Sequence, residues 1–482
     1  MRRTIACIAL TATVAMAATV STPAGGAEGE CPQKARRSEP ARWPAPPKKG
    51  DFDVVHFGEG HWNEGQGPKT MPILVQDVAR FAPEFVLFSS DMADTGSIDR
   101  LGCFRLLMDP LMRAGIPWYD SPGNHDRVPI AGAGGLVNGS IEVWRQVFSQ
   151  MPAPWGDARP PDRRFHAPKD TDGKGASTHY YFDFGPERKP ILRVIVLDNS
   201  MHSLTSSDTD QYPAVGAGGP DAGQLAFLDR VATEALDKGL MTWVVMHQPT
   251  QDPRELDNVH PISLNHTMGK GASPDNALFD VLADRAGVDA VLLGHIQGNA
   301  VYSFGSVDYF IDGGGGGSPY ALQDVGADSG YFYGFRVLRS FSGKDGWDFR
   351  PYMVPLVEEI ELDAPSTVPV GDEVQLSATA TQPFDPDLPP RAGLLPNEPI
   401  RLDLNPAGEE ADPAAPQVAY VWSTSDPSVL RPVPAEIDPR DDPAFDASSM
   451  TMSGRFEALK PGVVRIDLLV GTHRESAWVK VR

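Results

Sequence analysis

The stretch Ser121-Pro-Gly-Asn124-His125-Asp126 decides the fold, because it repeats a pattern found elsewhere in the chain: a short apolar run ends directly before residues that can bind a metal ion. Short apolar runs bounded by turn residues predict buried strands. Four further runs lead in the same way to Glu59 and His61, to Asp91 and Asp94, to His247, and to His295 and Gln297. In an open α/β sheet, sites form at the carboxyl ends of strands. The sequence therefore predicts one metal centre built from five strand ends.

Each of these residues has a commoner explanation when it is taken singly. A lone His at a strand end is more often a hydrogen-bonded structural residue than a ligand, and Asn-His-Asp after Pro-Gly is a plausible turn. Five such coincidences at successive strand ends favour the metal centre.

The order and spacing of these motifs resemble the calcineurin-like metallophosphoesterase superfamily over roughly residues 50 to 356. The pattern of that family is Asp-x-His, Gly-Asp-x-x-Asp, Gly-Asn-His-Asp/Glu, a lone His after a strand, and Gly-His-x-His. Three positions differ: Glu59 replaces the first Asp, Ser90 replaces a Gly, and Gln297 replaces the last His. The resemblance implies an α/β fold, a layered β-sandwich flanked by helices.

The resemblance also implies two divalent metal ions (Mn, Fe, Zn or Mg) and a phosphate-ester substrate. Asp91 would bridge the ions, and a hydroxide held between them would attack phosphorus. The other ligands would be Glu59, His61 and Gln297 for the first ion, and Asn124, His247 and His295 for the second. His125 would protonate the leaving alkoxide, with Asp126 or Asp94 orienting its ring.

The first metal's ligands depart most from the family pattern. The amide oxygen of Gln297 is a harder and poorer donor than imidazole, which shifts the preference from zinc towards manganese, magnesium or iron. His260 and His266, in the long loop expected after His247, are candidates for the missing imidazole. Side chains in such a loop more often face solvent or substrate. Two altered ligands leave open a one-metal or inactive site. The alternative function is therefore a non-catalytic extracellular binding protein with a degenerate metallophosphoesterase fold.

Two further motifs argue against a purple acid phosphatase and against a phosphate-binding loop. No Tyr directly follows the Asp91 block, where purple acid phosphatases, a subgroup of the superfamily, place a metal-bound tyrosinate. The glycine run at 313–317 lacks the Lys-Ser/Thr of a P-loop, so we expect it to have a backbone role.

The N-terminus is typical of a secretory signal peptide over residues 1–27. Arg2 and Arg3 precede an apolar stretch and then small residues; the alternative is a membrane anchor, for which this stretch is short and weakly apolar. No later segment has 18 uninterrupted apolar residues, so we expect a secreted chain, extracellular or in the cell envelope, without a membrane span. Of the three cysteines, Cys7 leaves with the signal, and Cys31 and Cys103 are expected to pair or to stay as free thiols.

The chain is strongly acidic. Its formal charge of −22 becomes −24 when the signal removes two arginines and no acid. This charge argues against nucleic acid or an anionic membrane surface as a partner. A phosphate substrate would need local positive charge, which bound metals can supply.

The sequence divides into a signal (1–27), a Pro-rich linker (28–48), the catalytic domain (49–356) and a β domain (357–482). In the catalytic domain, helices expected at 71–81, 103–112, 225–236 and 276–285 alternate with strands.

From residue 357, short alternating runs such as 464–468 and 477–481 predict a β-sandwich. This segment resembles a bacterial Ig-like domain, with Trp422 in its core and a cell-wall or surface partner as its candidate ligand. Pro/Asp-rich insertions at 383–416 and 434–448 are expected to be solvated loops. The acids of the second could hold calcium, although a charged surface is the commoner explanation. No site residue comes from this domain, so we expect it to be dispensable for chemistry.

Overall fold

The computed structural model describes residues 50–127, 141–148, 169–170, 179–199, 223–250, 274–317, 332–343, 346–388, 399–404, 420–433, 448–451 and 453–482. The predicted signal, the linker, Cys31, His260, His266 and most of both insertions lie outside the described residues. Cys103 is disulfide-bonded, and its pairing with Cys31 stays a prediction.

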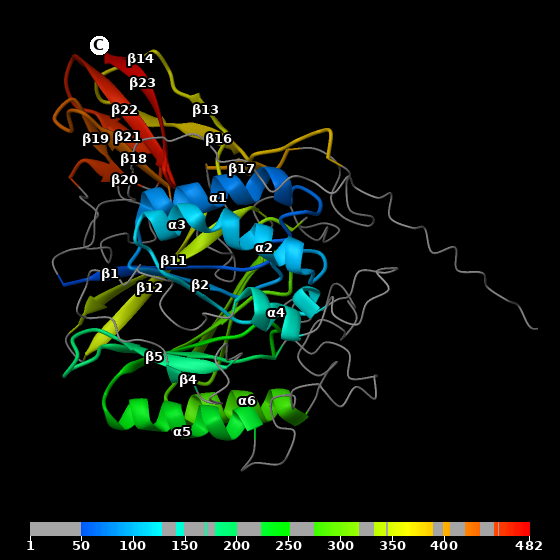
Figure 1. Ribbon diagram of the computed structural model, residues 1–482. Coiled ribbons are helices and arrows are strands. Elements are labelled where there is room, and N and C mark those ends of the chain that lie inside the picture. Colours follow the sequence, from blue (N-terminus) through cyan, green and yellow to red (C-terminus); the bar gives the residue numbers. More distant parts are fainter. Residues whose placement is uncertain are drawn as a thin grey trace, which may run out of the picture.

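Two mixed β-sheets lie face to face at the centre of the catalytic region (Figure 1). The first has the order β12-β11-β1-β2-β3, with β1 (Phe52–Phe57), β2 (Phe85–Phe88), β3 (Trp118–Asp120), β11 (Gly334–Ser342) and β12 (Trp347–Pro355). The second has the order β4-β5-β6-β7-β8-β10-β9, with β4 (Lys169–Asp170), β5 (Tyr180–Phe184), β6 (Leu192–Val196), β7 (Met241–Val245), β8 (Ala290–Leu293), β9 (Asn299–Phe304) and β10 (Val307–Asp312). Strands β1, β2 and β3 are parallel, as are β6, β7, β8 and β10. A buried cluster with Leu87 from one sheet and Trp243 from the other fills the space between them.

Helices cover the outer face of each sheet. Over the first lie α1 (Gly67–Phe81), α2 (Ile98–Leu107), α3 (Asp109–Arg113) and α4 (Ile141–Val147); over the second lie α5 (Gly223–Asp237) and α6 (Pro274–Arg285) (Figure 1). In α1, Leu74, Val78 and Phe81 recur at helical spacing and are buried, which explains why this segment docks as an amphipathic helix. The four layers fit the α/β metallophosphoesterase fold that the resemblance implied.

One predicted helix is wrong in detail. The segment 103–112 forms parts of two helices, α2 and α3, which meet at Met108. Pro110 has no backbone N–H to continue the first helix, and proline is well tolerated in the first turn of the second.

The C-terminal region is all-β among its described residues. Its strands are β13 (Glu359–Asp363), β14 (Thr367–Val368), β15 (Glu373–Gln375), β16 (Ser377–Thr381), β17 (Arg401–Asp403), β18 (Tyr420–Thr424), β19 (Leu430–Pro432), β20 (Met450–Thr451), β21 (Arg455–Ala458), β22 (Gly462–Val470) and β23 (His473–Val481). They form three sheets above α1 (Figure 1). Trp422 is fully buried there, as predicted.

The C-terminal region and the catalytic region share buried side chains. Val421 belongs to the apolar cluster of α1, while Phe332 and Met353 belong to the C-terminal cluster. No helix in the described part of the chain is both long and apolar enough to cross a membrane.

Candidate metal centre

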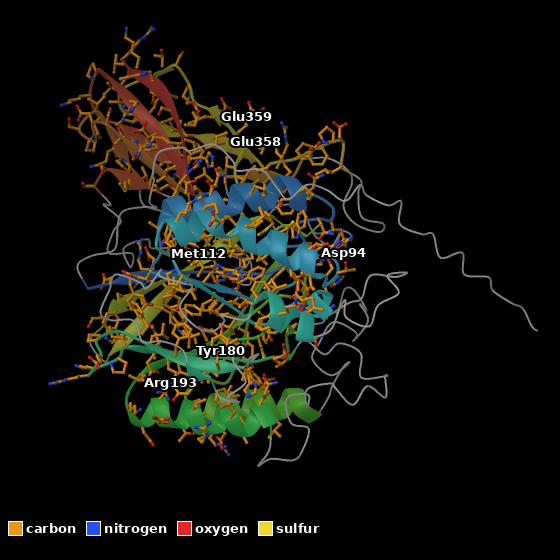
Figure 2. All side chains as sticks on the ribbon, in the orientation of Figure 1. Asp94, Met112, Tyr180, Arg193, Glu358 and Glu359 are labelled. Atoms are coloured by element: carbon orange, nitrogen blue, oxygen red, sulfur yellow. The ribbon has the colours of Figure 1, made fainter. Side chains whose placement is uncertain are left out.

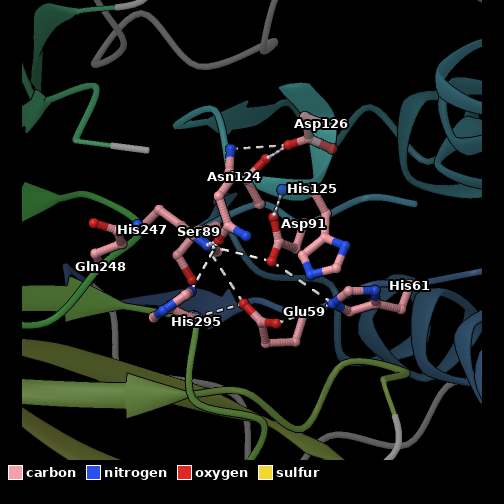
Figure 3. Close-up of polar contacts among 12 residues, drawn as sticks. Glu59, His61, Ser89, Asp91, Asn124, His125, Asp126, His247, Gln248 and His295 are labelled. Atoms are coloured by element: carbon pink, nitrogen blue, oxygen red, sulfur yellow. Dashed lines mark hydrogen bonds and ion pairs between the residues drawn. The ribbon is translucent and has the colours of Figure 1, made fainter. Parts of the chain in front are cut away.

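The structure brings the predicted ligands together at one edge of the two sheets (Figure 3). They follow the carboxyl ends of five strands, β1, β2, β3, β7 and β8, three from one sheet and two from the other. Among the described residues, Asp91, His247 and His295 can each offer a ligand atom within 4.8 Å of the others, as can Glu59, His61 and Asp91. Asp91 is common to both groups, which is the position that a bridging carboxylate would need.

The second metal's predicted ligands meet around the side-chain oxygen of Asn124. This Oδ1 lies 2.8 Å from Nε2 of His247 and 2.9 Å from Nδ1 of His295. Nδ1 of His247 lies 2.7 Å from the carbonyl oxygen of Ser89 and must donate to it, so in the neutral ring Nε2 carries the lone pair. Only in this neutral state does a lone pair face the Asn124 oxygen, and a bound cation would stabilise that state. These mixed nitrogen and oxygen donors fit a divalent transition metal.

The first metal's predicted ligands surround His61. Its Nε2 lies 3.1 Å from Oε2 of Glu59, 3.1 Å from Nε2 of Gln297 and 3.7 Å from Oδ2 of Asp91. The longer side chain of Glu59 also reaches across the site, because its Oε1 accepts a hydrogen bond from the backbone N–H of His295. The group could hold an ion, although one carboxylate oxygen of Glu59 already accepts a hydrogen bond from the loop that carries His295.

Buried opposite charges control the protonation of the site. Burial opposes protonation of His61, but its hydrogen bonds to Glu59 and Glu64 outweigh burial and raise the pKa to about 10. For His247, the charge of Asp91 likewise overcomes burial and raises the pKa to about 9. Burial opposes ionisation of Asp91, yet the charges of His247 and His125 hold its pKa well below the usual range. The site therefore keeps Asp91 anionic and favours positive charge beside it.

His125 occupies the edge of the site and is partly exposed. Its ring packs edge-on against that of His61, with the centroids 4.7 Å apart. Its backbone N–H donates to Oδ1 of Asp91 over 2.8 Å, and its Nδ1 lies 2.9 Å from the backbone carbonyl oxygen of Asp94. The predicted orientation of the His125 ring by Asp94 thus has a main-chain contact, and the Asp94 carboxylate lies 3.7 Å from the same Nδ1.

The carboxylate of Asp126 does not take the predicted position beside the His125 ring. Its buried carboxylate accepts hydrogen bonds from the hydroxyl of Ser90, the backbone N–H of Met92 (3.0 Å) and the backbone N–H of Gly123 (2.9 Å). Burial and the nearby charge of Asp91 raise the pKa of Asp126 to about 6, against these hydrogen bonds. Because this carboxylate is buried behind the turn that presents His125, it joins two site loops instead of orienting the His125 ring.

The backbone of the site is strained. Of the six non-glycine residues with positive φ in the described part of the chain, five lie in the site: Glu59, His61, Ser90, Asp91 and His295. Such outliers cluster at functional sites because the surrounding structure holds them in place.

Glycines allow the close approach of the site loops. A Cβ at position 123 would lie 2.2 Å from Oδ1 of Asp91, and one at position 315 would lie 2.1 Å from the carbonyl oxygen of Gly58. The glycine run has the predicted backbone role, because Gly315 and Gly317 donate to the carbonyl oxygens of Gly58 (3.0 Å) and Glu59 (2.8 Å).

The family model for calcineurin-like phosphoesterases matches residues 52–298, just over half of the chain. The chain belongs to the calcineurin-like phosphoesterase family. Two solved structures are similar at low identity: GAP50, the anchor in the inner membrane complex of Plasmodium (15% identity, TM-score 0.40, 63% of this chain and 84% of that one), and purple acid phosphatase PPD1 from yellow lupin, Lupinus luteus (13%, 0.38, 62% and 51%). The chain thus spans about half the length of the lupin protein. A comparison with curated proteins found no match.

Sequence reasoning missed two residues that hold the candidate ligands in place. Oε2 of Glu64 lies 3.3 Å from Nδ1 of His61, and its place three residues after a candidate ligand was the available signal. Oδ1 of the buried Asn199 accepts from the backbone N–H groups of His247 and Gln248, each over 2.9 Å. Asn199 follows β6 closely, so the strand-end rule that identified the other residues could have found it.

A buried ion network beneath the candidate metal centre was also missed. Asp312, at the end of β10, lies 2.5 Å from Nδ1 of His56 on β1 and 2.7 Å from Nη2 of Arg336 on β11. The network ties the second sheet to the first directly below the loops that carry the ligands.

Proposed function

We propose that the protein is a secreted phosphoesterase that hydrolyses phosphate esters with two divalent metal ions. The observation that carries this proposal is the position of Asp91, whose Oδ2 lies 3.3 Å from Nε2 of His247 and 3.7 Å from Nε2 of His61. Family membership supports divalent metals and phosphate-ester hydrolysis in general. The signal-like N-terminus supports export, and the all-β C-terminal region is our candidate for an Ig-like domain that holds a cell-wall or surface partner.

Each site residue has a distinct task in this proposal. Bound ions would supply a hydroxide nucleophile near neutral pH and offset the charge of the phosphate oxygens. Asn124, His247 and His295 would hold one ion, Glu59, His61 and Gln297 the other, and Asp91 both. His125 would protonate the leaving alkoxide. Because its Nδ1 lies against the Asp94 carbonyl, Nε2 is the atom that would transfer the proton.

A second candidate function is a non-catalytic binding protein. The substitutions at Glu59 and Gln297 favour it, since one Glu59 oxygen accepts from the His295 backbone and the Gln297 amide nitrogen faces His61. Both features weaken the first ligand set while leaving the second unchanged.

Elemental analysis combined with turnover of a generic aryl phosphate separates the two functions. The enzyme should copurify with, or take up, divalent metal and hydrolyse the ester. Asp91→Asn should lower metal content and turnover together, whereas Asp109→Asn, at an exposed carboxylate in α3, should change neither. Wild-type protein that binds no metal and has no turnover would support the binding protein.

Gln297→His tests whether the first ligand set is weakened or lost. Imidazole is a stronger ligand than an amide for zinc and iron. We expect Gln297→His to raise the number of tightly bound ions and to increase turnover. If wild-type protein binds no ion and Gln297→His adds none, the catalytic proposal fails and the binding protein stands.

A further inference from the structure

The loop that carries Glu59 and His61 contacts the C-terminal region through one buried side chain. Gln66 closes this loop directly before α1 and is only 7% exposed. Its Nε2 donates to the backbone carbonyl oxygen of Asp385 over 3.0 Å, and its Oε1 accepts from the backbone N–H of Asp385 over 2.9 Å. This reciprocal pair fixes the amide of Gln66 in one orientation.

The pair is linked to the ligands by a short turn. Within the loop, the backbone N–H of Glu64 donates to the His61 carbonyl oxygen, and that of Gly67 donates to the Glu64 carbonyl oxygen, each over 2.9 Å. The Glu64 side chain returns to Nδ1 of His61 at 3.3 Å. Displacement of Gln66 would therefore shift the His61 ring.

A second contact starts three residues earlier in the same C-terminal segment. The side chain of Gln382 is buried and makes three hydrogen bonds, to the backbone N–H (2.8 Å) and carbonyl oxygen (2.7 Å) of Tyr333 and to the carbonyl oxygen of Leu356 (3.0 Å). Next to Tyr333, the N–H of Gly334 donates to the carbonyl oxygen of Gly314 over 3.0 Å. Gly314 belongs to the glycine run that holds the Glu59 loop from its other side.

We propose that residues 382–385, which follow β16, are a brace that positions the first metal's ligand loop, residues 59–66, and that Gln66 is its positioning residue. The start of the first Pro/Asp-rich insertion, predicted to be a solvated loop, is thus packed against the catalytic region: Pro383 is buried, and the backbone of Asp385 bonds to Gln66. The brace rests on the proposed function only for its effect on metal binding.

The surface between the two regions offers a matched control. Nζ of Lys69, in the first turn of α1, lies 3.0 Å from Oε1 of Glu358, and the two side chains are 31% and 47% exposed. Glu358 lies against the helical layer, close to α1 (Figure 2). Lys69→Ala removes a side-chain contact across the same boundary and keeps the backbone N–H of residue 69, which donates to the carbonyl oxygen of Gln66.

The test compares Gln66→Met, Gln66→Asn and Lys69→Ala in the full chain by amide hydrogen exchange and Mn²⁺ titration. Methionine keeps the size of glutamine without its hydrogen bonds, and asparagine is too short to reach both atoms of Asp385. Loss of two buried hydrogen bonds should raise exchange at His61 and Trp62, and weaken the weaker Mn²⁺ site, on the order of tenfold. Exchange at Gly123 and His125, whose N–H groups donate to the side chains of Asp126 and Asp91, is the internal reference.

Several outcomes would overturn the brace. It is refuted if exchange at residues 59–66 is unchanged in the folded Gln66 variants, or if Lys69→Ala gives the same change. A uniform rise at His61 and His125 alike would indicate general destabilisation instead. If one Gln66 variant does not fold, the other decides. The exchange result stands even if the wild-type protein has no turnover, so failure of the brace and failure of the proposed function are distinguishable.

Discussion

At the scale of single residues, His125 is set apart from the ligands by its partly exposed ring at the edge of the site. We expect His125→Ala to retain metal and to slow hydrolysis by a factor on the order of 10² to 10⁴, because the leaving alkoxide loses its proton donor. The loss should shrink for aryl esters, whose leaving groups need little protonation. Turnover of alkyl and aryl esters, measured beside metal content, checks this.

His247→Ala is the matched comparison for His125. Its ring is buried, and its Nε2 faces both Asn124 and Asp91. This variant should lose metal and turnover for every leaving group. A loss in His125→Ala that is equal for alkyl and aryl esters would argue against a proton donor at this position.

At the scale of elements, the Asp312 network joins the two sheets. Asp312, His56 and Arg336 are all fully or nearly fully buried. Asp312→Ala leaves the Arg336 charge without its anion, so we expect it to cost about 3–5 kcal/mol of unfolding free energy, measured by urea denaturation. Asp109→Ala, which breaks an exposed pair with Arg113, should cost less than about 0.5 kcal/mol. A cost below about 1 kcal/mol for Asp312→Ala would contradict this role.

A carboxylate between the starts of β7 and β8 should make stability depend on pH. Burial raises the pKa of Asp289 to about 6, against a hydrogen bond from the backbone N–H of Thr242 (2.6 Å). The folded state then holds a proton that the unfolded state has released, so stability falls as pH rises from about 4 to about 6 and stays lower above it.

Asp289→Asn should remove this dependence. At pH 7.5 we expect the variant to melt at a higher temperature than wild type, with an unfolding free energy greater by at most about 3 kcal/mol. Near pH 4 the two proteins should differ little. Asp308→Asn, at an exposed position on β10, controls for the loss of one negative charge. A gain for Asp289→Asn that is equal at both pH values would refute the assignment.

At the scale of the whole molecule, the boundary near residue 356 is less independent than the sequence indicated. Removing residues 357–482 would break the hydrogen bonds of Gln382 to Tyr333 and Leu356. It would also remove Val421 from the apolar cluster of α1. We expect a chain ending at residue 356 to expose apolar surface and to bind a hydrophobic dye or aggregate. Dye fluorescence and light scattering measure this; a soluble, monomeric truncation with wild-type melting behaviour would restore the prediction of a dispensable domain.

The sequence by itself determined the α/β character of the fold and the strand ends that carry the candidate ligands. The reason is local within each sheet: apolar runs such as β2 and β8 bury themselves, and parallel neighbours place their carboxyl ends at one edge, β2 beside β3 and β7 beside β8. Packing of the two sheets against each other then brings Asp91 to His295. The all-β character of the C-terminal region followed equally from period-two alternation.

Only the tertiary structure decided which neighbours hold those ligands. Asp126 turns to Ser90 and Gly123, Asn199 fixes the His247 loop, and Gln66 pairs with Asp385 across 319 positions of sequence. A sequence pattern reports which way a segment faces, because that depends on its own periodicity. It does not report which distant backbone group a buried amide or carboxylate meets, because packing of the whole chain sets that choice.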